Sequence, residues 1–191
     1  MRVAIFAGSS SKSDELFYSE ASVIGATLAK MGHHLVYGGG AIGLMGAAAD
    51  AAISNDGKVI GVIPSFMVDE GWAHTGIDEL IVTTDMSSRK SRIFELADAI
   101  ISLPGGIGTL EELTEAMTLK QLGVYRGPIV ILNSKGFYNK FIEFIDHMAE
   151  KRFFRPEHKS MFLLAETAEE AVNMAVQNAS WIDNPRSLAR I

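Results

Sequence analysis

The chain has 191 residues, of which 48% are hydrophobic and 21% charged, a composition typical of one folded domain with a buried core. Its net charge of −6 at pH 7 argues against a general nucleic-acid-binding or membrane-surface protein, because both need a basic face. Because the chain has no cysteine, it has no thiolate nucleophile, thiolate metal site or disulfide.

Short apolar runs alternate with segments of helical spacing from the N-terminus onward. The first run is too short for a signal sequence, and no run approaches the ~18 apolar residues of a membrane span. We therefore expect a soluble cytoplasmic protein. Seven strands are predicted, at residues 3–7, 34–37, 58–63, 79–83, 99–103, 129–132 and 161–164. Helices are predicted at residues 14–31, from the glycine loop after residue 37 to about 54, and at 87–97, 110–122, 137–150 and 167–178.

Strands that alternate with helices and are apolar along their whole length are typical of a parallel sheet buried on both faces. The pattern predicts one α/β domain over residues 1–180, with a mostly parallel sheet of about seven strands and an irregular tail at 181–191. In such folds the loops at the carboxyl ends of the strands share one edge of the sheet, and ligands bind there where the strand order reverses. Residues 65–78 are predicted to be irregular. Ser13 is predicted to cap the first helix, and Ser87 or Ser88 the third, at residues 87–97.

Residues 103–112 read Leu-Pro-Gly-Gly-Ile-Gly-Thr-Leu-Glu-Glu, with three glycines between a predicted strand and a predicted helix. Free N–H groups and the positive dipole end at such a helix start favour an anion. The loop lacks the lysine of a P-loop, which argues against nucleoside triphosphate hydrolysis with magnesium. The five histidines show no metal-ligand spacing such as H-E-x-x-H, so no metal site is predicted.

Residues 38–43 match the letters G-x-G-x-x-G, the fingerprint of dinucleotide-binding sites. They follow the second predicted strand, and the acidic residue expected about 20 positions later is absent. Three interpretations stay open: a site for NAD, a backbone-lined pocket wall, and a tight strand–helix turn.

Glu112 also has two interpretations. Thr109 and Glu112 have the spacing of a capping box, and Thr167 and Glu170 repeat that spacing without preceding glycines. Alternatively, a carboxylate beside an anion-binding loop faces a different part of the ligand. A carboxylate suits the cleavage of a glycosidic bond, in which the sugar becomes positively charged. Successive helical residues point about 100° apart, so Glu111 and Glu112 cannot face the same way.

A basic cluster of Arg89, Lys90 and Arg92 precedes the fifth predicted strand. Arg89 continues the apolar stripe that contains Ile93 and Leu96, which places it on the buried face of its helix. An arginine there can bind a phosphate or a ribose hydroxyl through its fork of N–H groups. For Lys90 and Arg92 a solvated surface position is the alternative.

Four segments together resemble one known family. Residues 104–112 match P-G-G-x-G-T-x-x-E, and Arg89-Lys90 stands upstream, with Arg89 23 positions before Glu112. Residues 6–10, Phe-Ala-Gly-Ser-Ser, and the glycine-rich residues 37–46 complete the pattern. Over about residues 2–180 the chain resembles the LOG ("Lonely Guy") family of cytokinin riboside 5′-monophosphate phosphoribohydrolases, also labelled "possible lysine decarboxylase".

The resemblance implies a Rossmann-like three-layer fold, a homodimer with the site near the interface, and no metal or organic cofactor. It implies hydrolysis of the N-glycosidic bond of a small-molecule nucleoside monophosphate, N6-substituted AMP or AMP itself, to free base and ribose 5-phosphate. Arg89 and Glu112 would be the catalytic pair. The residues that would bind substrate are Lys90, Gly105, Gly106, Ile107, Gly108, Thr109, Leu110, Glu111 and Thr118, with Gly8, Ser9 and Gly39 on the opposite wall.

The chain departs from the family pattern in places that leave the base preference open. Ser87-Ser88 replaces a common His-x before Arg89, Ile107 replaces a common aromatic residue, and Leu119-Lys120 replaces a common Trp-Ala. Decarboxylation through pyridoxal phosphate has no support, because that chemistry needs a Schiff-base lysine with supporting partners and Lys90 shows no sign of them. A module of the same fold that binds a nucleotide without turnover is the alternative function, and an NAD-dependent oxidoreductase is a weaker one.

Overall fold

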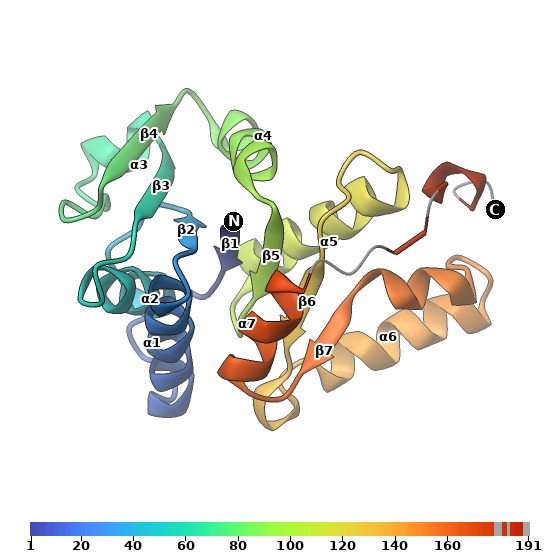
Figure 1. Ribbon diagram of the computed structural model, residues 1–191. Helices are drawn as coiled ribbons and strands as arrows, with labels where there is room; N and C mark the ends of the chain where they lie inside the picture. The colour runs from blue at the N-terminus through green and yellow to red at the C-terminus, as the bar shows by residue number, and fades with distance from the viewer. Residues whose placement is uncertain (178–180, 183, 189–191) are drawn as a thin grey trace.

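A computed structural model describes residues 1–177, 181–182 and 184–188. Within these residues strands and helices alternate along the chain (Figure 1). The strands are β1 Arg2–Phe6, β2 His34–Tyr37, β3 Val59–Pro64, β4 Glu79–Thr83, β5 Ala99–Ser102, β6 Ile129–Leu132 and β7 Leu163–Ala165. The α-helices are α1 Glu15–Lys30, α2 Gly43–Ile53, α3 Ser65–Asp69, α4 Met86–Leu96, α5 Ile107–Gln121, α6 Asn139–Glu150 and α7 Ala168–Val176. Short 3-10 helices lie at Ser134–Gly136, Pro156–Met161 and Pro185–Ser187.

The strands form one seven-stranded sheet in the order β4-β3-β2-β1-β5-β6-β7, and the six neighbouring pairs are parallel. The predicted α/β class is therefore confirmed. The chain builds the sheet outward from β1 to β4 and then returns to the other side of β1 with β5. Val3 of β1 consequently pairs with Leu35 of β2 and with Ala99 of β5. The strand order reverses at β1 and β5, where a parallel sheet opens a ligand crevice at the carboxyl ends of its strands.

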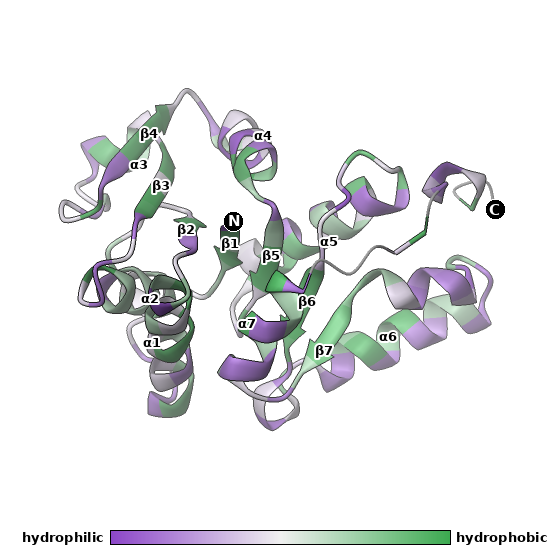
Figure 2. Cartoon of the chain, in the orientation of Figure 1, coloured by the Kyte–Doolittle hydropathy of each residue, from purple (hydrophilic) through white to green (hydrophobic). Residues whose placement is uncertain are grey.

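Helices cover both faces of the sheet, because successive strand residues point to opposite sides. Val3, Ile5 and other residues of one strand face pack against α1, α2 and α7. Ala4, Phe6 and other residues of the opposite face pack against α4, α5 and α6. Figure 2 shows strands such as β3, β5 and β7 largely green and helices α1 and α6 in mixed purple and green, as expected for a three-layer fold. No helix in the described part of the chain is long and apolar enough to cross a membrane.

Several predicted boundaries are wrong. Asp14, not Ser13, caps α1, with its carboxylate accepting from the N–H of Leu16 at 2.9 Å. Asp85 caps α4, and Ser88 completes the capping box from inside the helix. The segment predicted as irregular contains α3. The predicted tail contains the 3-10 helix Pro185–Ser187, while residues 178–180, 183 and 189–191 lie outside the described residues.

Candidate active site

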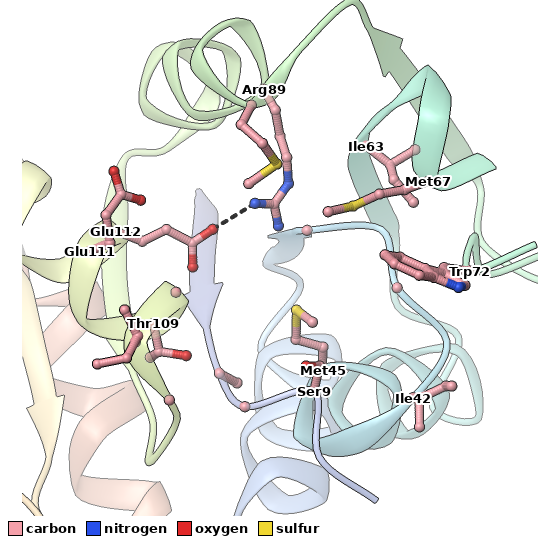
Figure 3. A pocket seen from close by; sticks show the side chains of 18 of the residues that line it. Ser9, Ile42, Met45, Ile63, Met67, Trp72, Arg89, Thr109, Glu111 and Glu112 are labelled. Atoms are coloured by element: carbon pink, nitrogen blue, oxygen red, sulfur yellow. Dashed lines mark hydrogen bonds and ion pairs between the residues drawn. The ribbon is translucent and has the colours of Figure 1, made fainter. Parts of the chain in front are cut away.

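The loops that leave β1, β2 and β5 meet at the carboxyl edge of the sheet. The N–H of Gly8 donates to the carbonyl of Pro104 at 3.1 Å, and the N–H of Leu44 donates to the carbonyl of Gly8 at 2.9 Å. These bonds join the loop after β5 to the start of α2 through the loop after β1. A cavity of about 560 Å³ opens between these loops, α4 and α5 (Figure 3). That volume lies in the range typical of small-molecule sites.

The N-terminus of α5 forms one end of this cavity. The helix begins at Ile107 with Gly106 as its N-cap residue, three residues earlier than the predicted start at Leu110. No side chain of the described residues caps it, and its first turn carries no acidic residue. A Cβ added at Gly106 or Gly108 would meet no atom within 4 Å, so both glycines border open space. Uncapped N–H groups beside open space are suited to binding an anion.

The capping-box interpretation of Glu112 is wrong. Thr109 lies within the first turn of α5, is 4% exposed, and does not occupy the N-cap position. The second copy of the pattern does cap a helix, since the Thr167 hydroxyl accepts from the N–H of Glu170 at 3.2 Å. Glu112 is thus free of a capping role.

Glu112 instead forms a buried ion pair with Arg89. Nη1 of Arg89 donates to Oε1 of Glu112 at 2.9 Å, and the two side chains are 7% and 9% exposed. Nε of Arg89 also donates to the carbonyl of Val62, in the carboxyl-terminal half of β3, at 3.1 Å. The pair therefore joins α4, α5 and the sheet edge at the wall of the cavity (Figure 3). Arg89 is buried, as the helical stripe predicts.

Two opposing effects act on the acidity of Glu112. Burial raises the pKa of its carboxyl group above the ordinary value, because the charged form loses hydration, and the Arg89 guanidinium partly offsets this. A buried carboxylate that borders a cavity can stabilise a positive charge that develops on a ligand. Arg89 keeps the carboxylate in a defined position.

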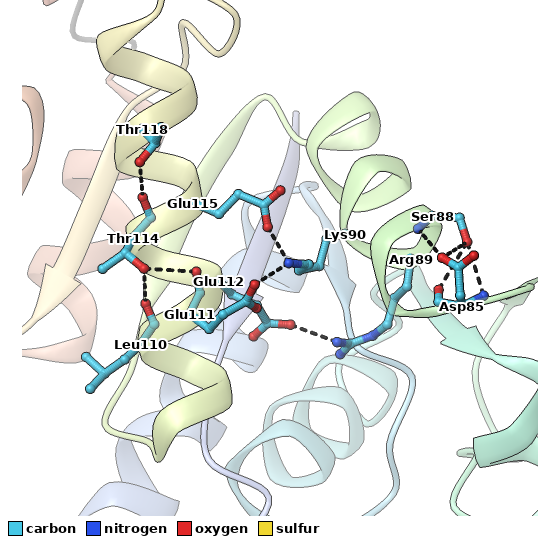
Figure 4. A network of polar contacts seen from close by, with 10 residues as sticks. All are labelled: Asp85, Ser88, Arg89, Lys90, Leu110, Glu111, Glu112, Thr114, Glu115 and Thr118. Carbon is cyan, nitrogen blue, oxygen red and sulfur yellow. Dashed lines mark hydrogen bonds and ion pairs between the residues drawn. The ribbon is translucent and has the colours of Figure 1, made fainter.

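Lys90 also reaches from α4 to α5, where it contacts other carboxylates than Arg89 does (Figure 4). Its ammonium group pairs with Glu111 and, at 2.6 Å, with Oε2 of Glu115. The hydrogen bond to Glu111 is the largest cause that raises the pKa of Lys90. Glu111 and Glu112 diverge as helical geometry predicts, because one contacts Lys90 and the other Arg89. Lys90 is thus a brace between two helices.

The loop that joins β5 to α5 is supported from below by Tyr138. Its hydroxyl donates to the carbonyl of Leu103 at 2.6 Å and lies 3.1 Å from Oγ of Ser102. Burial raises the pKa of Tyr138 to about 12, so the hydroxyl stays protonated. A Cβ added at Gly105 would lie 2.1 Å from Oγ1 of Thr109, so the loop backbone at this glycine packs directly against the Thr109 side chain.

The structure brings most of the predicted site residues to the cavity wall, although their contact with a ligand stays a prediction. The wall includes Gly8, Ser9, Arg89, Gly106, Ile107, Gly108, Thr109, Glu111 and Glu112. Five predicted residues do not line it: Lys90, Leu110, Thr118, Gly39 and Gly105. Thr118 donates to the carbonyl of Thr114 on the exposed side of α5, and Gly39, with φ +74°, turns the loop whose neighbours Gly38 and Gly40 line the cavity.

Sequence reasoning missed the apolar wall of the cavity. Its side chains are those of Ile42, Met45, Ile63, Met67, Trp72 and Met86. Met67 and Trp72, in the stretch predicted as irregular, were the available signal of this wall, because large apolar residues are unusual in a solvated loop.

Comparisons with known proteins agree with this architecture. The family model described as "Possible lysine decarboxylase" matches residues 45–175. A cytokinin riboside 5′-monophosphate phosphoribohydrolase of Arabidopsis thaliana is 39% identical over 171 residues, which are 90% of this chain and 75% of that protein. A protein of the same name from Rhodococcoides fascians is 39% identical over 171 residues, with 89% of this chain and 86% of that protein covered.

Among solved structures, the molybdenum cofactor carrier protein of Chlamydomonas reinhardtii has a TM-score of 0.72 at 22% identity, covering 92% of this chain and 96% of that one. The molybdenum cofactor binding protein of Rippkaea orientalis has a TM-score of 0.69 at 21% identity, covering 90% and 93%. At these identities the likeness concerns the Rossmann-like fold alone. The matches in sequence carry the assignment: the chain belongs to the LOG family, whose model bears the description "possible lysine decarboxylase".

Proposed function

We propose that this protein hydrolyses the N-glycosidic bond of adenosine 5′-monophosphates, N6-substituted or plain, and releases the free base and ribose 5-phosphate. The observation that carries the proposal is the buried Arg89–Glu112 pair, 2.9 Å between Nη1 and Oε1, beside the uncapped start of α5. The names of the relatives from Arabidopsis thaliana and Rhodococcoides fascians support the same reaction.

The polar end of the cavity accounts for substrate binding. The phosphate binds at the N–H groups of α5, where the helix dipole favours negative charge and no side chain of the described residues competes. Ser9 on the facing loop supplies a hydroxyl group. The ribose then lies beside Glu112, with Arg89 fixing the carboxylate and contributing positive charge toward the phosphoryl and ribose oxygens.

The chemical step separates C1′ of the ribose from N9 of the base. The electron pair of that bond leaves with the base, and the ribose becomes positively charged as in an oxocarbenium ion. The Glu112 carboxylate stabilises this charge and takes a proton from the attacking water. The water oxygen bonds to C1′, and the proton passes to the departing base, so that one water molecule is consumed for each bond broken.

A panel of nucleoside monophosphates tests the proposal. Purified protein is incubated with AMP, N6-isopentenyl-AMP, GMP and CMP, and free base and ribose 5-phosphate are separated by chromatography. Glu112→Gln keeps the size and hydrogen bonding of the side chain but removes its charge, so we expect a loss of about 10²–10³ in rate. Tight nucleotide binding by calorimetry with no base released over hours would instead support a nucleotide-binding module.

We also infer that the protein forms a homodimer with the site near the interface. Ile107, at the first turn of α5, is 82% exposed at the wall of the cavity. A large apolar side chain in this position is suited to coverage by a second copy of the chain. Sedimentation velocity of the purified protein measures its mass in solution, and a monomer at all concentrations would contradict the inference.

A further inference from the structure

The cavity has two chemically different ends, which Figure 3 shows on opposite sides of the view. Thr109, Glu111 and Glu112 lie on the α5 side, with Arg89 between the two ends. Met67 and Trp72 lie on the far side. Apart from the indole N–H, the lining side chains of that far end are apolar. A ligand whose phosphate binds α5 therefore directs its base toward an apolar surface.

Trp72 stands on a segment that is docked firmly against the glycine loop after β2. The backbone N–H of Trp72 donates to the carbonyl of Met67 at 3.0 Å, and the carbonyl of Trp72 accepts from the backbone N–H of Ala41 at 3.1 Å. The next residue, Ala73, forms an antiparallel bridge with Gly40. The backbone of Trp72 is thus held from both sides.

His74 completes the attachment of this segment. Its N–H donates to the carbonyl of Gly39 at 2.9 Å, and its Nε2 lies 3.0 Å from Oδ1 of Asp50 on α2. Nδ1 of His74 accepts from the N–H of Gly76 at 3.0 Å, which assigns the proton to Nε2. Trp72 is therefore fixed to the same loop whose Gly38 and Gly40 line the cavity.

The exposure of Trp72 contrasts with this fixed backbone. Trp72 is 48% exposed although it lines the cavity. An exposed indole keeps a large apolar area in contact with water unless a ligand covers it. An apolar group that extends from a base toward this end would cover the ring.

We propose that Trp72, together with Met67, is the residue that sets the preference of the site for a base with a large apolar substituent. The inference rests on the proposed function and extends it to one side chain. The substituent contacts the indole ring, whereas the adenine ring lies nearer the glycine loop and Met45. Trp72 therefore strengthens binding in proportion to the apolar area of the substituent and forms no hydrogen bond with the edge of the base. Hydrophobic walls of this kind discriminate between ligands by contact area.

Steady-state kinetics with AMP and N6-isopentenyl-AMP test the proposal. Trp72→Ala is expected to lower kcat/KM for N6-isopentenyl-AMP by about 10-fold to 100-fold and that for AMP by less than about threefold. Trp72→Phe keeps an aromatic surface and is expected to retain most of the preference. Phe66→Ala is the matched control, because Phe66 is 47% exposed on α3, the short helix that carries Met67, but does not line the cavity. An unchanged ratio of the two kcat/KM values in Trp72→Ala would overturn the proposal.

Fluorescence separates this inference from the proposed function. The chain has two tryptophans, so Trp181→Phe leaves Trp72 as the only tryptophan, and its emission is followed with excitation that tyrosine does not absorb. The second substitution, Glu112→Gln, prevents the ligand from being hydrolysed during the measurement. In the double variant we expect N6-isopentenyl-AMP to change the Trp72 emission strongly, AMP weakly and ribose 5-phosphate not at all. An emission change without turnover by the wild type would refute only the hydrolysis. Equal emission changes with AMP and N6-isopentenyl-AMP would refute the role of Trp72.

Discussion

Gly38 makes room for Arg89, and replacing it with alanine should displace the guanidinium group. A Cβ at position 38 would lie 1.9 Å from Nη2 of Arg89 and 3.1 Å from Cζ. Arg89 has little freedom to yield, because its Nε is bonded to Val62 at 3.1 Å and its Nη1 to Glu112 at 2.9 Å. Gly38→Ala is therefore expected to break at least one of these bonds.

The size of the effect follows from the geometry. A Cβ atom essentially never has a non-bonded nitrogen atom closer than 3.0 Å. The guanidinium group must therefore move by about 1 Å. A misplacement of about 1 Å at a catalytic group costs about 100-fold in rate. Gly40→Ala is the matched control, because its Cβ would make only an ordinary contact with Cε of Met45 at 3.5 Å. We expect it to lose no more than about threefold in kcat/KM.

A double-mutant cycle makes this prediction independent of stability. Base release is measured for wild type, Gly38→Ala, Arg89→Ala and the double variant, with melting temperatures for each protein. Once Arg89 is truncated, the Cβ at position 38 meets no guanidinium group, so the second substitution should cost almost nothing further. Additive losses in the double variant, or full activity of Gly38→Ala, would refute the reasoning.

Three further predictions concern titration and packing. Because burial raises the pKa of Glu112, kcat/KM should fall as the pH drops through a value above the ordinary one for glutamate, and a pH profile without an acid limb above about pH 4.5 would contradict this. Burial lowers the pKa of Lys120 to about 8, while its Nζ donates to the carbonyl of Gly127 at 2.6 Å. The unfolded chain then binds more protons between pH 8 and 10.5, so the stability of wild type relative to Lys120→Met should rise by up to about 3 kcal/mol over that range, as urea unfolding would measure. Tyr138→Phe removes the bond to the carbonyl of Leu103, so we expect a loss of about 1–3 kcal/mol in unfolding free energy together with a higher KM for the nucleotide, whereas unchanged kinetics would show that the hydroxyl does not position the loop.

The fold was readable from the sequence because its signals are local and repeated. Apolar strands such as 99–103 alternate with helices, and this alone indicates a parallel sheet with its crevice at one edge. The buried position of Arg89 was also predictable, since the helical period places it in line with Ile93. Such inferences need only the spacing within one element.

The role of Glu112 could not be settled from spacing, because it depends on where α5 begins. The spacing of Thr109 and Glu112 matches a capping box, which favours a helix start after Thr109. The chain begins the helix after Gly106 and leaves its N–H groups uncapped, so the local capping pattern does not decide where this helix starts. The contact of Trp72 with the cavity depends on pairing between distant loops, which no periodicity reports.

The central position of β1 has a consequence for synthesis and folding. The first strand to leave the ribosome pairs on one side with β2, which follows soon after it, and on the other with β5, which follows after half of the chain has been made. Until β5 arrives, one backbone edge of β1 has no partner strand, and such edges attract other chains. The glycine loop of α5 is made later still. A nascent chain therefore passes through a period in which one edge of its central strand is open and its candidate site does not yet exist, and truncations that end before Ala99 are prone to aggregate.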